Sequence, residues 1–323
     1  MAIVNTSGTP IVRADLGEAY KEYVMAPETY IGVRVLGSYP VARKAAKWPK
    51  VLREQYLRAA EGIVRAAGAH YSRGKVKTED LFYQCKERGR EEKLPHEERA
   101  LYASEYDAEM VTTEEAVNKV VLNQEIAIAA MIFDGTTNFT VGNGRRTDVT
   151  TAWALPAADI IGDVVDAVEK VRQRTGMDAD TLVIGKAVIP YFLKNTAIRD
   201  AIKYTELAGV EAIKRSLSAL FGLEKILIGG GVQNTANDGA TPVISDIWSP
   251  IWASVCKTAS PGDSLARPSL GRTLFWTNDA DTESALVEEY EEAQTRSTIY
   301  RARSNAAEIF TDLGLAQLLD IAA

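Results

Sequence analysis

Histidine and cysteine are scarce in this sequence, with only two of each among 323 residues. Neither His70 nor His96 has a ligand-type partner three or four positions further along a helix, and no D-x-D-x-D-G loop occurs. Serine or cysteine catalysis would therefore lack its usual base. The run of glutamates at positions 288–292 is typical of a solvated strand rather than of a general-acid pair. We expect no enzymatic activity, with no catalytic residue, no cofactor and no metal.

The two cysteines are also too few for a disulfide framework. Cys85 and Cys256 lie in unlike contexts, FYQCKERG and ASVCKTAS. This usage is typical of reduced thiols in a protein made in a cytoplasm, where disulfides are rare. We expect both side chains to be structural.

Long apolar runs are absent as well. No stretch approaches the roughly 20 apolar residues that cross a bilayer, and the first residues, MAIVNTSGTPIVRADL, have no basic and apolar regions of a signal peptide. We therefore expect no membrane association and no secretion by the usual route. The composition, 46% hydrophobic and 25% charged, is that of a folded protein with one or two cores.

Charge is distributed unevenly along the chain. The net charge of -7 argues against nucleic-acid binding as the main task. Residues 42–77 hold many bases against only Glu54 and Glu61, whereas residues 279–292 hold acids and no base. The bases are Arg43, Lys44, Lys47, Lys50, Arg53, Arg58, Arg65, Arg73, Lys75 and Lys77; the acids are Asp279, Asp281, Glu283, Glu288, Glu289, Glu291 and Glu292. The two segments are either ordinary solvated faces or complementary contact surfaces.

The stretch 156–231 carries the clearest pattern of secondary structure. Asp159 is a plausible N-cap for an amphipathic helix that ends at Gly176. The apolar runs 181–185 (TLVIG) and 225–229 (KILIG) predict two buried strands. The glycines at 229–231 do not open a helix, so they predict a turn rather than a phosphate-binding loop.

A long helix is predicted over residues 113–134. Thr112 and Glu115 have the spacing of a capping box, and Asp134 with Gly135 ends the apolar stripe. At 1.5 Å per residue, about 22 residues make a rod of roughly 33 Å. Upstream, residues 31–37 (IGVRVLG) alternate like the end of a strand, and helical spacing within 52–67 predicts some helix there.

The order of these pieces, with NTAIRDAIKYT between the two strands and FGLEKILIGG after them, resembles the major capsid proteins of tailed phages. The resemblance implies the α+β capsid fold named after bacteriophage Hong Kong 97. It divides the chain into five parts: an N-terminal arm (1–39), an extended loop (40–77), a peripheral domain with its spine helix (78–155), an axial domain (156–277) and a C-terminal return to the peripheral domain (278–323).

The resemblance also implies a function, which is self-assembly into the icosahedral head shell of a tailed double-stranded DNA phage. The protein would then reside in the virion after assembly in the host cytoplasm. The candidate inter-subunit contacts are the bases of the loop and the acids near the C-terminus, namely Arg43, Lys44, Lys47, Lys50, Arg53, Arg58, Glu288, Glu289, Glu291 and Glu292. Reversing Arg53 and Arg58 to glutamate should hinder lattice formation while leaving the subunit folded.

The implied partners are other copies, arranged as pentamers and hexamers. A portal, a decoration protein and packaged double-stranded DNA held without base readout complete the set. The sequence starts at Met1 without a long leading segment, which favours a separate scaffolding protein. Some capsid proteins join a loop lysine to an asparagine of another subunit, but no motif here selects one of Lys44, Lys47 and Lys50 for that reaction.

Two other functions stay open at this point. One is an encapsulin-type compartment, which has the same fold but an enzyme cargo. The other is a nucleotide-dependent α/β enzyme built around TLVIG and KILIGGG.

Overall fold

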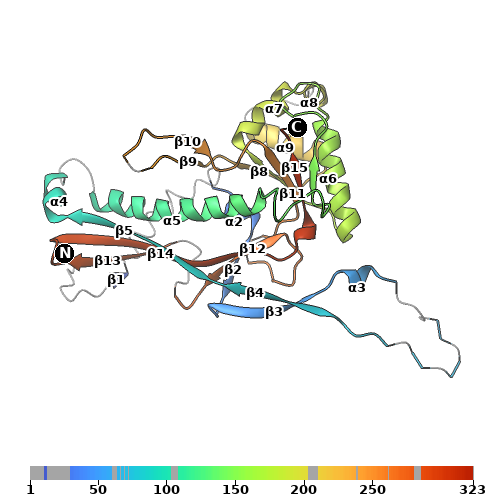
Figure 1. The fold of residues 1–323 in the computed structure, drawn as a ribbon, viewed down its shortest axis with the longest axis horizontal. Helices are drawn as coiled ribbons and strands as arrows, with labels where there is room; N and C mark the ends of the chain where they lie inside the picture. The colour runs from blue at the N-terminus through green and yellow to red at the C-terminus, as the bar shows by residue number, and fades with distance from the viewer. Residues whose placement is uncertain are drawn as a thin grey trace.

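The computed structural model describes residues 11–12, 30–59, 64–65, 67–68, 70–71, 73–102, 108–202, 210–237, 239–260, 262–279 and 285–322. Most of the predicted N-terminal arm (1–39) lies outside these ranges, as do Ala60, Glu61, Ile63, Asp281 and Glu283. The described chain is elongated, with two sheets, one long helix and two projecting hairpins (Figure 1).

The first sheet is built around one long strand, β14. Strands β5 and β13 pair with its first half and β12 with its second half, all antiparallel, while β2 lies parallel to β12. The members are β1 (Ile11–Val12), β2 (Ser38–Val41), β5 (Lys86–Pro95), β12 (Gly271–Trp276), β13 (Leu286–Glu292) and β14 (Ser297–Phe310). Its strands β5, β13 and β14 come from the ranges predicted for the peripheral domain (78–155) and the C-terminal return (278–323).

Helix α5 (Ala108–Ile132) lies across this sheet and spans about 37 Å at 1.5 Å per residue (Figure 1). It buries Val117 and Val120 against Val287 and Ala302 of the sheet. It follows the short helix α4 (His96–Tyr102) at one end of the molecule.

The start of α5 differs from the prediction. The helix already includes Thr112, whose hydroxyl donates to the Ala108 carbonyl oxygen (2.7 Å), and Glu115 accepts from Lys119 instead of reaching back (2.6 Å). The predicted capping box at Thr112 and Glu115 is therefore wrong. Both residues prefer partners one helical turn away, which is equally compatible with a helix interior.

The second sheet has the order β6-β15-β11-β7-β8. Strands β7 (Thr181–Gly185) and β8 (Lys225–Gly229) are the two predicted strands, and they pair in parallel and in register. The others are β6 (Arg146–Asp148), β11 (Trp252–Cys256) and β15 (Ala316–Asp320). Leu182 packs in a cluster with helix α6 (Ile160–Thr175) on one face, and Val183 packs with Ile128 of α5 on the other, which explains why TLVIG is apolar without alternation.

Helices cover the face of the second sheet on which Leu182 lies. The helix predicted from Asp159 to Gly176 is confirmed as α6 (Ile160–Thr175): the Asp159 carboxylate accepts from the Gly162 amide, and Gly176 adopts the left-handed conformation with φ 71°. The other helical elements between β6 and β8 are η1 (Lys186–Val188), α7 (Ile189–Lys194), α8 (Thr196–Ile202) and α9 (Val210–Phe221).

Two strands join a sheet made mostly of segments from other predicted parts of the chain. Strand β12 (Gly271–Trp276), within the predicted axial domain (156–277), belongs to the first sheet. Strand β15, within the predicted C-terminal return (278–323), pairs with β11 in the second sheet. The strand end predicted at residues 31–37 is wrong: residues 32–35 form helix α2 (Gly32–Val35), and its Gly32 amide donates to Glu125 on α5.

The two projections are β-hairpins. One consists of β3 (Ala45–Val51), within the extended loop predicted over 40–77, and β4 (Thr78–Gln84), which follows that range. Within the described part of that loop, the predicted helix is limited to α3 (Glu54–Leu57). The other hairpin, β9 (Val232–Asn234) with β10 (Ile244–Asp246), projects above α5 (Figure 1).

Candidate subunit-contact surfaces

The root of the long hairpin is fixed by two of the bases predicted to contact other subunits. Arg53 donates to Asp312 (Nη2 to Oδ1, 2.8 Å) and Lys50 donates to the Thr311 carbonyl oxygen (2.7 Å). Asp312 also caps the short helix η2 (Leu313–Leu315) by accepting from the Gly314 amide (2.9 Å). Lys50 and Arg53 therefore bind residues of their own subunit, Thr311 and Asp312, rather than standing free in solvent.

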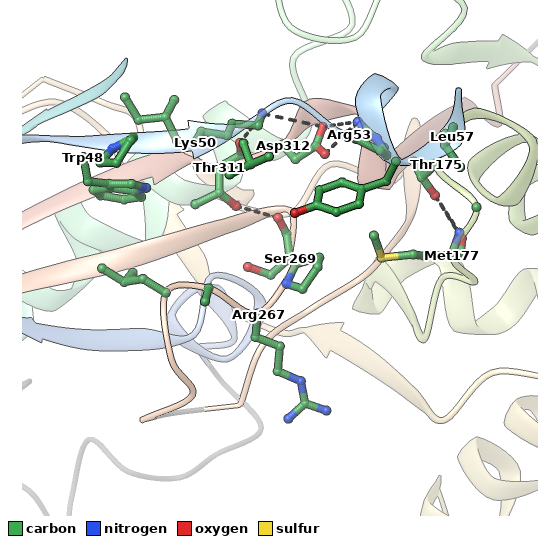
Figure 2. A pocket seen from close by; sticks show the side chains of 18 residues that line it. Trp48, Lys50, Arg53, Leu57, Thr175, Met177, Arg267, Ser269, Thr311 and Asp312 are labelled. Atoms are coloured by element: carbon green, nitrogen blue, oxygen red, sulfur yellow. Dashed lines mark hydrogen bonds and ion pairs between the residues drawn. The ribbon is translucent and has the colours of Figure 1, made fainter. Parts of the chain in front are cut away.

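A cavity of about 560 Å³ lies beside this root (Figure 2). Its walls come from the hairpin, from the end of α6 and from the segments 265–269 and 311–312. Leu57 of α3 lies so close to Gly176 that a β-carbon there would be 3.1 Å from its Cδ2 atom. The hairpin root is thus seated against the end of α6 as well as against Asp312.

Beyond the paired strands β3 and β4, the side-chain amide of Gln55 bridges the two arms of the hairpin. Gln55 donates to the Lys77 carbonyl oxygen (2.6 Å) and accepts from the Lys77 amide (2.8 Å), as a paired strand residue would. A second cavity of about 620 Å³ opens beside it, lined by Val51, Gln55, Tyr56, Arg58, Ala59, Arg73, Gly74, Lys75 and Val76. Tyr56 and Val76 are 78% and 63% exposed, so this surface combines positive charge with uncovered apolar area.

The other predicted bases are solvent-exposed on the same hairpin. Lys47 and Arg58 are exposed, as is Arg43, whose carbonyl oxygen accepts from the Tyr83 hydroxyl. Lys44 lies over the Trp276 ring, with Nζ 5.4 Å from the ring centroid. The structure therefore separates the predicted basic set into an exposed group and an internally paired group, Lys50 and Arg53.

The predicted acidic partner does not form a free surface. Glu288 is only 6% exposed and accepts from Arg303 (2.9 Å) and Arg301 (3.4 Å), both on the neighbouring strand β14. Arg303 also donates to Asp279, which lowers the pKa of that carboxyl, and the two carboxylates raise the pKa of Arg303. Sequence reasoning missed this because the bases that neutralise the acids lie in the next strand.

The remaining acids of β13 are half-buried rather than clustered in solvent. Glu291 lies 3.7 Å from Nε2 of His96, Glu292 accepts from the Thr295 hydroxyl, and Glu289 pairs in register with Tyr300 of β14. We therefore do not retain residues 288–292 as the acidic docking surface.

A different acidic surface occurs at α4 and the start of α5. Residues 97–102 and 108–114 contain four acids, Glu97, Glu98, Glu109 and Glu114, and one base, Arg99, which pairs with Glu109. Glu97 and Glu98 are exposed, and so are the apolar side chains Leu101 (67%) and Val111 (49%). We name residues 97–102 and 108–114 the acidic corner; it lies at the end of the molecule opposite the long hairpin (Figure 1). The density of acids was visible in the sequence, but its exposure was not.

The ends of the parallel strands β7 and β8 are the usual ligand site in open α/β sheets. Here they are filled by Trp248. A β-carbon on Gly185 would lie 2.2 Å from the Trp248 carbonyl oxygen, and one on Gly229 would lie 2.1 Å from its ring. The glycines of TLVIG and KILIGGG thus make room for a tryptophan, and the place that a nucleotide-dependent enzyme would use is occupied.

The cysteines lie in the interior. Cys85 and Cys256 are 1% and 0% exposed, and burial raises the pKa of both thiols. Within the ranges given above, no helix combines the length and hydropathy needed to cross a bilayer.

Sequence comparisons place this chain near two curated phage proteins, although no family model matches it. It is 26% identical over 140 residues to the major capsid protein of Pseudomonas phage JBD67, an alignment that spans 43% of each chain. It is 21% identical over 220 residues to the major capsid protein of Burkholderia phage BcepMu, spanning 68% of each chain.

Structural comparisons extend over nearly the whole chain. A phage-related protein from Bordetella bronchiseptica has a TM-score of 0.68 at 19% identity, covering 97% of this chain and 98% of that one. A putative prophage capsid protein from E. coli CFT073 (TM-score 0.58, 10% identity) covers 97% and 100%, and the virus-like particle protein of Pyrococcus furiosus (0.57, 9%) covers 95% and 98%. The resemblance to phage capsid proteins and the α+β Hong Kong 97-type fold are confirmed.

Proposed function

We propose that this chain is the major capsid protein of a tailed double-stranded DNA phage, and that it assembles into the icosahedral head shell. The observation that carries the proposal is the full-length correspondence with a prophage capsid protein, together with matches in sequence to two phage major capsid proteins. The role is structural rather than enzymatic, and the protein resides in the virion after assembly in the host cytoplasm.

The shape of the chain supports this role. The rod α5 lies across a six-stranded sheet, and both hairpins project well beyond the packed body (Figure 1). Projections that bury little of their surface within one chain are suited to contacts with neighbours. Many contacts of modest energy, summed over a closed shell of pentamers and hexamers, give durability while each pair stays reversible.

The contact surfaces proposed here are the exposed bases of the long hairpin and the acidic corner. They have opposite charge, each includes uncovered apolar side chains, and they lie at opposite ends of an elongated molecule. Such an arrangement favours head-to-tail contacts between copies, which close into rings when the rotation permits. Arg58, Arg73 and Lys75 would face Glu97 and Glu98 of the next copy.

Further partners are proposed from the capsid role. They are a separate scaffolding protein, a portal, a decoration protein and packaged DNA contacted without base readout. An encapsulin-type compartment is the second candidate, because a virus-like particle protein shares the fold at a similar TM-score. Particles that contain nucleic acid and no cargo protein would favour the phage shell.

Electron microscopy of the purified protein, with and without the scaffold, tests the proposal directly. We expect closed particles tens of nanometres across. A protein that stays monodisperse and small under crowding and with added scaffold would contradict it.

A charge swap tests the contact surfaces. Arg58→Glu with Arg73→Glu should abolish particles, and so should Glu97→Lys with Glu98→Lys. A chain that carries all four changes should recover assembly, since each copy supplies both ends. Arg199→Glu, a reversal at an exposed base of α8, is the matched control and should assemble normally. Failure of the fourfold variant to recover, while both doubly substituted chains stay folded, would contradict this pairing of surfaces but not the shell function.

A further inference from the structure

One buried carboxylate joins three separate parts of the molecule. Glu125, in the middle of α5, is 3% exposed. It accepts from the amides of Ile31 (2.8 Å) and Gly32 (2.8 Å) and from the indole Nε1 of Trp248 (2.7 Å). The two amides lie at the start of helix α2, where Ile31 is the N-cap and Gly32 the first helical residue. Trp248 lies just before β11 of the second sheet.

Within the part of the chain that the structure describes, this carboxylate is held by hydrogen bonds rather than by an ion pair. Among the described residues no basic side chain forms an ion pair with Glu125, and desolvation raises its pKa despite the three donors. Burying a carboxylate costs free energy unless hydrogen bonds satisfy it, so an apolar side chain would fill this place in the core at lower cost. The three donors are what make the position tolerable.

The backbone at Gly32 is shaped for this contact. A β-carbon there would lie 2.6 Å from Oε2 of Glu125 and 2.9 Å from Cδ1 of Ile128. Only glycine lets α2 approach α5 closely enough for both amides to reach the carboxylate.

The indole is equally constrained. Trp248 is fully buried, its ring meets Phe133 edge-on with centroids 5.1 Å apart, and Gly185 and Gly229 are packed against it. Its position is therefore set by the ends of β7 and β8. Oε1 of Glu125 accepts from both Trp248 and Ile31, so the second sheet and the start of α2 share one acceptor atom.

We propose that Glu125 is a joint that couples the position of helix α2 to the orientation of the second sheet relative to α5. If the second sheet moves so that the Trp248 indole shifts, Oε1 of Glu125 moves with the indole. The hydrogen bonds from the Ile31 and Gly32 amides to Glu125 are then weakened. Loosening of α2 has the same effect on the indole, because a coupling between two contacts is reciprocal. The proposal concerns the subunit itself and does not depend on shell assembly.

Hydrogen exchange in the unaltered protein gives the first test. If the three donors open together, the Ile31 amide, the Gly32 amide and the Trp248 indole N–H should share protection factors within about threefold. Protection factors for the indole and the two amides that differ by more than tenfold would overturn the joint.

A substitution gives the second test. Trp248→Phe removes the indole donor but keeps an aromatic ring, and it should speed exchange at Ile31 and Gly32 about tenfold, equivalent to about 1.4 kcal/mol of coupling. The matched control is Trp276→Phe, which removes an indole bond to the Ala42 carbonyl in the first sheet and should leave exchange at 31–32 unchanged. Unchanged exchange in the folded Trp248→Phe protein would overturn the proposal; if that variant does not fold, the protection factors of the unaltered protein decide.

Discussion

Arg53 and Asp312 lie 259 positions apart in the sequence and form an ion pair at the root of the long hairpin, with Nη2 2.8 Å from Oδ1. The pair joins the segment that follows β3 to the segment that links the two sheets. Because Asp312 also caps η2, a single carboxylate orders both segments. The direction of the hairpin is therefore fixed by the folded subunit.

The first prediction separates Arg53 from Arg58. Arg53→Ala should lower the free energy of unfolding of the unassembled subunit by about 1 kcal/mol, because the Asp312 carboxylate loses a partly buried partner. Arg58→Ala should leave stability unchanged, since Arg58 is exposed, and should affect assembly alone. Urea unfolding followed by circular dichroism measures both, and equal destabilisation by the two substitutions would argue against this division of roles.

The second prediction concerns pH. Burial raises the pKa of Glu125 above its ordinary value of 4.5, so the folded state holds this proton more tightly than the unfolded state. Its contribution to stability is thus fully present below about pH 4.5 and is lost as the pH rises through the folded pKa.

Glu125→Gln cannot titrate and should lack this loss. We expect the free energy of unfolding of the unaltered protein, relative to Glu125→Gln, to fall between pH 4.5 and 7 by about 1.4 kcal/mol for each unit of pKa difference. Urea titrations at three pH values measure this trend. A relative stability that instead rises with pH would show that the hydrogen bonds outweigh the burial.

The third prediction concerns the glycine that ends β8. Gly229→Ala would place a β-carbon 2.1 Å from the Trp248 ring and should destabilise the protein by about 1–3 kcal/mol through overpacking. Gly74→Ala is the control, since no atom lies within 4 Å of the added β-carbon and its φ is not in the left-handed region. The shift in the urea midpoint of unfolding measures the difference between the two variants. An unchanged midpoint in Gly229→Ala would contradict the close packing of Trp248 against Gly229.

The fourth prediction concerns the thiols. Cys85 and Cys256 are buried and their pKa values are raised, so the reactive thiolate is both rare and inaccessible. Neither should react with a thiol reagent within minutes in the folded protein, and both should react at once in denaturant. Rapid labelling of either cysteine without unfolding would indicate a reactive role that the structure does not provide.

Local patterns in the sequence were sufficient for several elements. The cap at Asp159, the stop at Gly176 and the two apolar runs TLVIG and KILIG are correct because each depends on neighbours within a few residues. The capping box at Thr112 failed for a related reason. A Thr and a Glu three positions apart fit a helix start, but Thr112 can also bond to the preceding turn, and tertiary packing carried the helix back to Ala108.

The candidate surfaces were only half predictable. The basic character of the hairpin was visible in the sequence, whereas the burial of Glu288 was not, because its neutralising partners, Arg301 and Arg303, lie on the neighbouring strand β14. The pairing register of two strands decides which charged side chains lie opposite each other. That register depends on both strands, so the pattern of one segment does not reveal it.

Hydrophobic period, turn residues and caps are local properties, so they were enough to place α6, β7 and β8. The α+β capsid fold was an expectation from the resemblance that the order of these pieces carries. Which charges stay exposed to solvent depends instead on contacts between segments that pack together in the folded chain. Glu125, Glu288 and Asp312 are each held by donors from distant segments, and the cost of burying a carboxylate is settled by those donors rather than by its neighbours in the chain.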